Sequence, residues 1–193
     1  MAAATPVKEF SNEITTGNFI FRSREFEIME FEYFVKPGTD EKWFDYWVEE
    51  RLNWYIKLGI RKENLKLYQH PREKLAHYAN AAADIEFDFP FGFKELWGIA
   101  YRTDYDLQQH IAHSGAKMGY VDPFTGKKFV PHVIEPALGI SRVFLMLLCD
   151  AYWEDPENKR KVLRFKRVVP QARAIRKRWG WGIGILKCRQ RHA

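Results

Sequence analysis

The stretch Phe21-Arg22-Ser23-Arg24-Glu25-Phe26-Glu27-Ile28-Met29-Glu30 sets arginine and glutamate side chains in an apolar frame. A second stretch, Val133-Ile134-Glu135-Pro136-Ala137-Leu138-Gly139-Ile140-Ser141-Arg142, repeats this combination much later in the chain. Charged side chains are costly to bury unless they are paired or bind a ligand. A site built from both stretches therefore suits a ligand that carries both signs of charge, such as an amino acid together with a nucleotide phosphate.

Length and composition favour one folded domain. The chain has 193 residues, of which 46% are apolar and 16% aromatic, which is enough for a buried core. No apolar run is long enough to span a bilayer, and the first residues lack the pattern of a secretory signal. Cys149 and Cys188 form no metal-binding cluster. We therefore expect a cytoplasmic protein with reduced thiols and no membrane partner.

The net charge of +6 is unevenly distributed along the chain. Residues 1–158 hold 18 Lys/Arg against 25 Asp/Glu, whereas residues 159–193 hold 13 Lys/Arg and no acidic residue. This split predicts a globular unit over 1–158 and a basic tail over 159–193 that is disordered or translated out of frame. The alternative is a basic arm that binds RNA phosphates in a salt-dependent way.

Hydrophobic patterns predict an α+β fold. Up to Lys8 we expect a frayed lead, followed by a long strand over 20–35 that is buried on both faces. Apolar residues at helical spacing predict a helix over 40–58, ended by a left-handed Gly59. A second, apolar helix is predicted over 140–152, with Val143, Phe144, Leu147, Leu148 and Ala151 facing inward. Strands with inserted helices, in place of regular βαβ units, indicate an antiparallel sheet.

The two stretches quoted first resemble motifs 2 and 3 of class II aminoacyl-tRNA synthetases, and most closely those of the homodimeric glycyl-tRNA synthetases. The similarity runs from about Ser11 to about Tyr152 and includes Trp47-Val48-Glu49-Glu50-Arg51, His77-Tyr78-Ala79 and Gly98-Ile99-Ala100-Tyr101-Arg102-Thr103-Asp104. Ordered agreement over most of the chain is far more specific than either motif alone. The resemblance implies a class II catalytic sheet of six or seven antiparallel strands flanked by helices, here incomplete.

The resemblance also implies an activity and its partners. Glycine would be activated by ATP, accompanied by Mg²⁺, to glycyl-adenylate and then transferred to the 3′ end of tRNA(Gly). Two other readings stay open. One is an inactive synthetase-like module that binds nucleotide or RNA, and the other is an amino-acid ligase with an acceptor other than tRNA.

Residues for the ATP side follow from the same resemblance. Arg22 and Arg142 would be the catalytic arginines, because a guanidinium grips phosphate oxygens with two bonds. Phe26 would stack on adenine, Glu13 would hold the adenine edge, and Arg24 joins the same ATP-binding set. Without the resemblance, Arg22 and Arg24 would simply pair with neighbouring glutamates on a sheet.

Glu95 stands where the family has an acid that contacts ATP or its metal, and Mg²⁺ prefers such oxygen ligands. On the glycine side, Glu30 and Glu135 would bind the ammonium, accompanied by Arg102 and by Ala137 where the family has a serine. The residues alone leave a second reading, in which Arg102 and a glutamate form a buried structural ion pair.

The sequence departs from the family at a phosphate-binding position and at both ends. Ser11 stands where motif 2 has an arginine for the α-phosphate and the substrate carboxylate. We find no motif 1, which builds the family's dimer interface, no Arg-Pro-Glu-Thr segment and no anticodon-binding domain. We therefore expect a catalytic domain truncated at both ends. The family forms homodimers, and this chain lacks the motif that builds the dimer interface.

Overall fold

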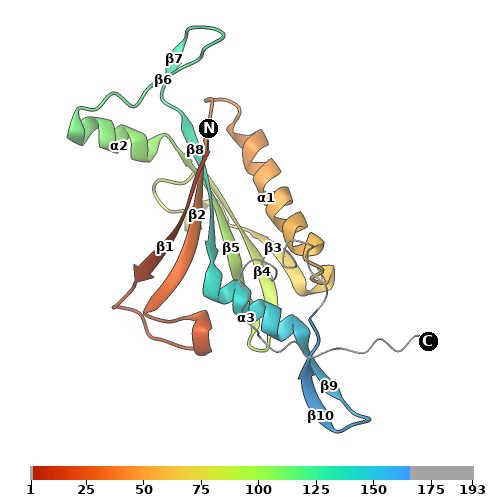
Figure 1. Cartoon of the computed structure of the whole chain (residues 1–193). Helices are drawn as coiled ribbons and strands as arrows, with labels where there is room; N and C mark the ends of the chain where they lie inside the picture. The colour runs from red at the N-terminus through yellow and green to blue at the C-terminus, as the bar shows by residue number, and fades with distance from the viewer. Residues whose placement is uncertain (1, 166–193) are drawn as a thin grey trace, which may run out of the picture.

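The computed structural model describes residues 2–165 and shows an open antiparallel sheet with helices against it (Figure 1). The strands are β1 (Ala2–Phe10), β2 (Glu25–Val35), β3 (Leu65–Gln69), β4 (Ala81–Phe89), β5 (Gly92–Thr103), β6 (Tyr120–Val121), β7 (Lys128–Phe129), β8 (His132–Gly139), β9 (Tyr152–Asp155) and β10 (Arg160–Leu163). The helices are α1 (Asp40–Lys57), α2 (Tyr105–Ser114) and α3 (Ile140–Ala151), with 3₁₀ turns η1 (Phe19–Phe21), η2 (Lys62–Asn64) and η3 (Arg72–Lys74).

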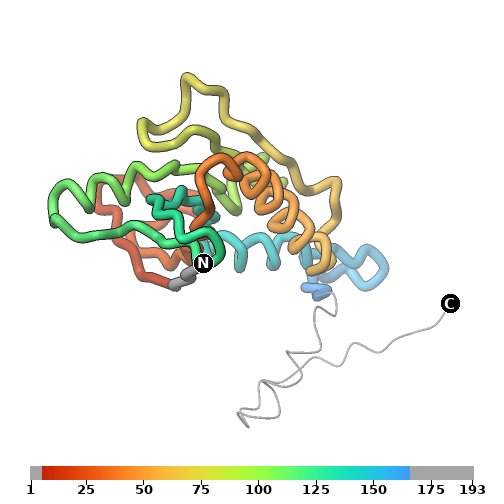
Figure 2. The backbone as a smooth tube through the Cα atoms, turned by 90° about the horizontal axis from the view of Figure 1, so that it is seen from above, coloured from red at the N-terminus to blue at the C-terminus, as the bar shows by residue number. Residues whose placement is uncertain are grey.

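Six strands form the main sheet in the order β1-β2-β8-β5-β4-β3, and each neighbouring pair is antiparallel. This confirms the predicted fold class. The two small sheets, β6–β7 and β9–β10, are hairpins outside it. Both views place α2 and the β9–β10 hairpin at opposite ends of the molecule (Figure 1, Figure 2).

The sheet buries one face and leaves the other for polar side chains. On the central strand β8, Ile134, Pro136 and Leu138 are buried, while Glu135 and Ala137 alternate with them on the other face. On β5, the side chains of Trp97, Ile99 and Tyr101, which follow a bulge, are buried on the same face. Trp97 is only 2% exposed. Helix α1 contacts β4, β5 and β8 and closes the core on that face.

Helix α1 confirms the prediction for residues 40–58. Phe44, Val48 and Tyr55 are its buried apolar positions, and their spacing gives the helix one inward stripe. The chain leaves the helix through Gly59, whose φ of 84° is easily reached only by a residue without a Cβ. The three tryptophans of the helix, Trp43, Trp47 and Trp54, also pack against the buried cluster.

The N-terminal part differs from the prediction. The expected frayed lead is strand β1, paired along its length with β2 from Ala2↔Tyr33 to Phe10↔Glu25. The open edge of β2 supplies the hydrogen-bonding partners, and this tertiary pairing outweighs a weak local pattern. The predicted long strand is shorter than expected, because residues 19–21 form η1, and its side chains are mostly half-buried.

Helix α3 begins and ends close to the predicted bounds, but one inward position was wrong. Met146 and Ala151 are buried, whereas Phe144 is 55% exposed. Residues 144 and 146 lie about 200° apart around a helix, so a helix that buries Met146 turns Phe144 to solvent. The apolar composition of the segment hid this, since nearly every position could have faced inward.

The C-terminal boundary falls within a hairpin. Strands β9 and β10 pair from Arg160↔Asp155 to Leu163↔Tyr152, across the predicted division at 158. The division into two units stays a prediction, and residues 166–193, which hold most of the basic tail, lie outside the described residues. Within residues 2–165, no helix is long and apolar enough to cross a membrane.

Two phenylalanines of contrasting burial provide a test of this core. Phe87 on β4 is 1% exposed, and Phe144 is 55% exposed. We expect Phe87→Ala to lower the free energy of unfolding by about 3–5 kcal/mol, because it leaves a cavity in the core. Phe144→Ala should cost less than about 1 kcal/mol. Urea denaturation measures both, and equal losses would contradict the assigned faces.

Candidate active site

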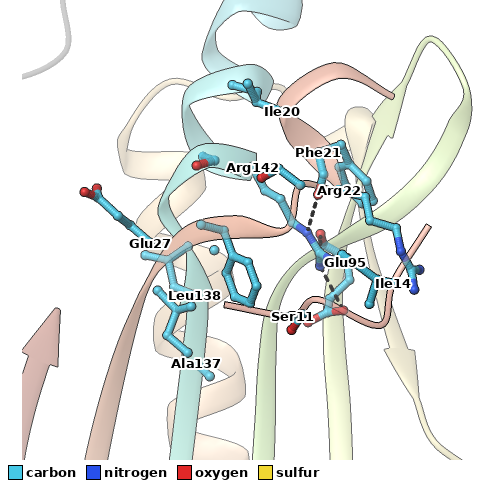
Figure 3. A pocket seen from close by; sticks show the side chains of 15 residues that line it. Ser11, Ile14, Ile20, Phe21, Arg22, Glu27, Glu95, Ala137, Leu138 and Arg142 are labelled. Atoms are coloured by element: carbon cyan, nitrogen blue, oxygen red, sulfur yellow. Dashed lines mark hydrogen bonds and ion pairs between the residues drawn. The ribbon is translucent and has the colours of Figure 1, made fainter. Parts of the chain in front are cut away.

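A cavity of about 330 Å³ opens where β8 runs into α3, beside η1 and the near end of β5 (Figure 3). It is walled by segments from the two stretches that the sequence singled out, together with the loop after β1. The lining residues with polar or aromatic groups are Ser11, Phe21, Arg22, Ser23, Phe26, Glu27, Glu95, Ser141 and Arg142. The predicted residues Arg22, Phe26, Glu95, Ala137 and Arg142 therefore share one cavity.

Arg142 is the fixed cation of this cavity. It lies in the first turn of α3, and its Nη1 donates to Glu95 Oε2 at 3.0 Å while its Nε donates to the Phe21 carbonyl at 3.3 Å. Its guanidinium also lies 4.4 Å from the centre of the Phe21 ring. In Figure 3 it occupies the space between Phe21 and Glu95. These contacts hold the side chain in place before any ligand arrives.

The other predicted ATP-binding residues are less constrained. Arg22 is exposed and extends away from Arg142 in Figure 3, so its guanidinium is free to close onto a ligand. Glu13 and Arg24 are also exposed, but they do not line the cavity. Glu25 pairs with Lys8 of β1. The roles of Glu13 and Arg24 stay predictions.

A second polar cluster lies on the same sheet face, around Arg102 of β5. Arg102 Nε donates to Asp106 Oδ2 at 2.7 Å, and Nη2 donates to Asp106 Oδ1 at 3.1 Å. Its Nη1 donates to Glu135 Oε1 at 3.0 Å, and the guanidinium lies 4.2 Å from the centre of the Tyr78 ring. Thus the predicted pairing of Arg102 with a glutamate is present, with Asp106 as a further partner.

Local backbone geometry aims Arg102 at these partners. The pairing of β5 with β8 shifts register between Tyr101 and Thr103, and Thr103 has a φ of 58°, a costly value for a β-branched residue. This turn lets α2 begin directly after the strand. Asp106 of α2 then reaches back to Arg102, and the ion pair lowers the pKa of Asp106.

Strand pairing gathers glutamates next to this arginine. Glu30 of β2 is paired with Ala137 of β8, and Tyr33 is paired with Ile134, so Glu32 lies across from Glu135 between those pairs. Burial and the neighbouring Glu135 raise the pKa of Glu30. Burial and a hydrogen bond with Glu135 raise the pKa of Glu32 to about 8. Ala137 connects the two clusters, because it also lines the cavity of Arg142.

Comparison with known proteins gives the same assignment as the motifs. No family model matches the chain. The chain is 56% identical over 165 residues to the glycine–tRNA ligase of Acetivibrio thermocellus, which covers 84% of the chain and 36% of that protein. It is 52% identical over 170 residues to the glycine–tRNA ligase of Lysinibacillus sphaericus, and 55% identical over 165 residues to that of Thermobifida fusca. The chain belongs to the glycine–tRNA ligase family.

Coverage is unequal between the chain and these glycine–tRNA ligases. More than four fifths of the chain is matched, yet the chain spans only 36–37% of the length of these three relatives. The family assignment agrees with the fold and with the two stretches that wall the cavity. The roles of individual residues in the ligase reaction are a separate question, and they stay predictions.

Glu95 offers a metal ion one carboxylate, and that carboxylate already holds Arg142. Among residues 2–165, no group of three His, Cys, Asp or Glu side chains could hold a metal ion. This arrangement does not fit a resident metal cage. It does fit a Mg²⁺ that arrives on ATP, since such an ion keeps several waters and takes one or two carboxylates besides the phosphates.

Three residues of the site were missed by the sequence analysis. Asp106 and Tyr78 both contact Arg102, and Glu32 lies across from Glu135. Glu32 was within reach of sequence reasoning, because residues two apart on a strand share a face and Glu30 was already placed there. The contacts of Asp106 and Tyr78 depend on the turn after Thr103 and on a loop from elsewhere in the chain.

The raised pKa of Glu32 predicts a pH-dependent stability. The folded protein keeps this proton up to about pH 8, whereas an unfolded glutamate loses it near pH 4.5. Between those values the folded state binds more protons, so the free energy of unfolding contributed by this group falls as pH rises. Urea denaturation from pH 5 to pH 8 should show that decline in the parent chain and a flatter profile in Glu32→Gln. Parallel profiles would contradict the prediction.

Proposed function

We infer that this chain binds ATP and glycine on the exposed sheet face and catalyses formation of glycyl-adenylate, the first half of the glycine–tRNA ligase reaction. One observation carries this proposal. The cavity that holds Arg142 adjoins the acidic cluster around Arg102, and Ala137 belongs to the border between them. A cavity whose arginines suit phosphates thus lies beside a cluster of carboxyl groups that suits an ammonium group.

The reaction needs positioning and charge stabilisation more than covalent help from the protein. A glycine carboxylate oxygen forms a bond to the α-phosphorus of ATP, and the bond from that phosphorus to the pyrophosphate oxygen breaks. Arg142 is already held in a position to bind the negatively charged phosphates, and the exposed side chain of Arg22 can move onto the same phosphates. Glu30 and Glu135 bind the ammonium, which orients the carboxylate toward the phosphate. Mg²⁺ bound to the phosphates would neutralise further charge, with Glu95 as its protein contact.

Small residues on the sheet face suit a substrate without a side chain. Gly98 of β5 is paired with Ala137 of β8 at the floor of the site. A Cβ at Gly98 would lie 3.3 Å from Glu95 Oε1, which is tighter than an ordinary contact. A larger residue at position 98 would therefore displace the Glu95 carboxylate, which holds Arg142. Transfer of the glycyl group to tRNA(Gly) completes the proposed function, as the names of the relatives suggest.

A second candidate function rests on Ser11. This residue lines the cavity where the resembling motif has an arginine for the α-phosphate. A hydroxyl cannot replace that charge, and loss of such a group costs on the order of 10²–10³ in rate. The alternative is a synthetase-like module that binds nucleotide without activating glycine.

Glycine-dependent exchange of pyrophosphate into ATP tests the proposal on the purified 193-residue chain. We expect exchange that requires glycine and is lost in Glu135→Gln, which removes the charge that binds the ammonium. Glu50→Gln is the matched control, because Glu50 is a half-buried glutamate of α1 that pairs with Lys57, on the helix that covers the other face of the sheet. No exchange in a folded sample that still binds a fluorescent ATP analogue would favour the second candidate.

Restoring the missing charge gives a gain-of-function prediction. We expect Ser11→Arg to raise the exchange rate by up to about 10²–10³, because the new guanidinium would face the α-phosphate. The measurement is the exchange rate at saturating glycine and ATP, compared with a Ser11→Gln variant of similar bulk. An equal rate in both variants would show that charge at this position is not limiting.

A further inference from the structure

Glu32 has no assigned role, yet it is in contact with the acidic cluster. It lies on the same face of β2 as Glu30 and across from Glu135 of β8. Directly opposite side chains on paired strands have Cβ atoms about 4.5–5.5 Å apart, so the carboxyl groups of Glu32 and Glu135 are close enough to share a hydrogen bond, which contributes to the raised pKa of Glu32. Two carboxyl groups can form that bond only when one of them carries a proton, because an ionised carboxylate has no donor.

The charges around Glu32 and Glu135 explain which of the two carboxyl groups keeps the proton. Glu30, Glu32, Glu135 and Asp106 all face the single guanidinium of Arg102, and Glu9 of β1 adds to the field at Glu30. Asp106 accepts hydrogen bonds from Nε and Nη2 of Arg102, and Glu135 accepts one from Nη1. Within residues 2–165, the side-chain hydrogen bonds of Arg102 go to Asp106 and Glu135, and none goes to Glu32. Carboxylates this close cannot all ionise, so a proton stays at Glu32.

We propose that Glu32 is a positioning residue for the substrate amine, which donates its carboxyl proton to Glu135 in the free protein and releases that proton when an ammonium group binds. This inference rests on the proposed function, since it concerns the same amino-acid site. The protonated Glu32 fixes the orientation of the Glu135 carboxylate between two donors, Glu32 on one side and Arg102 on the other.

Ligand binding changes the balance of charge at this pair. The ammonium of glycine brings a positive charge between Glu30 and Glu135, which favours the ionised form of a nearby carboxyl. Glu32 then loses its proton to solvent, and the site gains a negative charge that strengthens its hold on the ammonium. Glycine binding should therefore tighten as pH rises, by at most about tenfold per pH unit when one whole proton is released.

Calorimetry can count this proton. Glycine is titrated into the full chain near pH 7 in two buffers that differ in ionisation enthalpy, and the difference in heat gives the protons released per glycine. We expect release of a large fraction of one proton from the parent chain and none from Glu32→Gln, which keeps a donor toward Glu135 but has no proton to lose. Glu50→Gln, on the helix that covers the other face of the sheet, should release as many protons as the parent chain does.

The outcomes separate this inference from the proposed function. Glycine binding without proton release, or with equal release from Glu32→Gln, would overturn the role of Glu32 and leave glycine binding intact. Absence of any binding heat would overturn the proposed function and, with it, the coupling to an amine.

A measurement without ligand tests the pair by itself. Titration of the side-chain ¹³C carboxyl resonances should show one glutamate with a midpoint near 8, absent in Glu32→Gln. In Glu135→Gln the midpoint of Glu32 should fall, because the neighbouring negative charge is gone. A Glu32 midpoint in the ordinary range, or one that ignores Glu135→Gln, would overturn the shared proton.

Discussion

The pairing of β8 between β2 and β5 is the constraint on which the rest of the structure depends. It sets Ala137 across from Glu30 on one side and from Gly98 on the other, and it brings Glu135 beside Glu32 and Arg102. Because side chains alternate along a strand, a slip of one residue would turn these groups into the core and bring Ile134 and Leu138 out. The apolar face of β8 therefore fixes the register of the polar one.

The site combines two arginines that are anchored by fixed partners with several glutamates that lie close to one another. Arg142 is tied to Glu95 and to the Phe21 carbonyl, and Arg102 is tied to Asp106 and Glu135. Such anchoring lowers the entropy that a flexible arginine would lose on binding a ligand. The crowded glutamates have the opposite character, because burial and the neighbouring carboxylates raise the pKa values of Glu30 and Glu32.

Much of this could be predicted from the sequence. The antiparallel fold, the helix over 40–58 and the meeting of two distant stretches all follow from pattern and from the family resemblance. Other features could not. The Ala-containing start of the chain has no strong strand pattern, and it becomes β1 only because β2 offers an open edge. Phe144 faces solvent because the side of α3 that packs against the core is the side that carries Met146 and Ala151.

By itself, the sequence determined the family, the class of fold and the types of charged group at the site, since these depend on residue identity and spacing along the chain. Tertiary structure alone decided which charges meet. The Asp106 and Tyr78 contacts of Arg102 and the placement of Glu32 across from Glu135 depend on strand register and on the strained turn at Thr103. Electrostatic energies vary steeply with distance and burial, and these quantities exist only once the chain has folded.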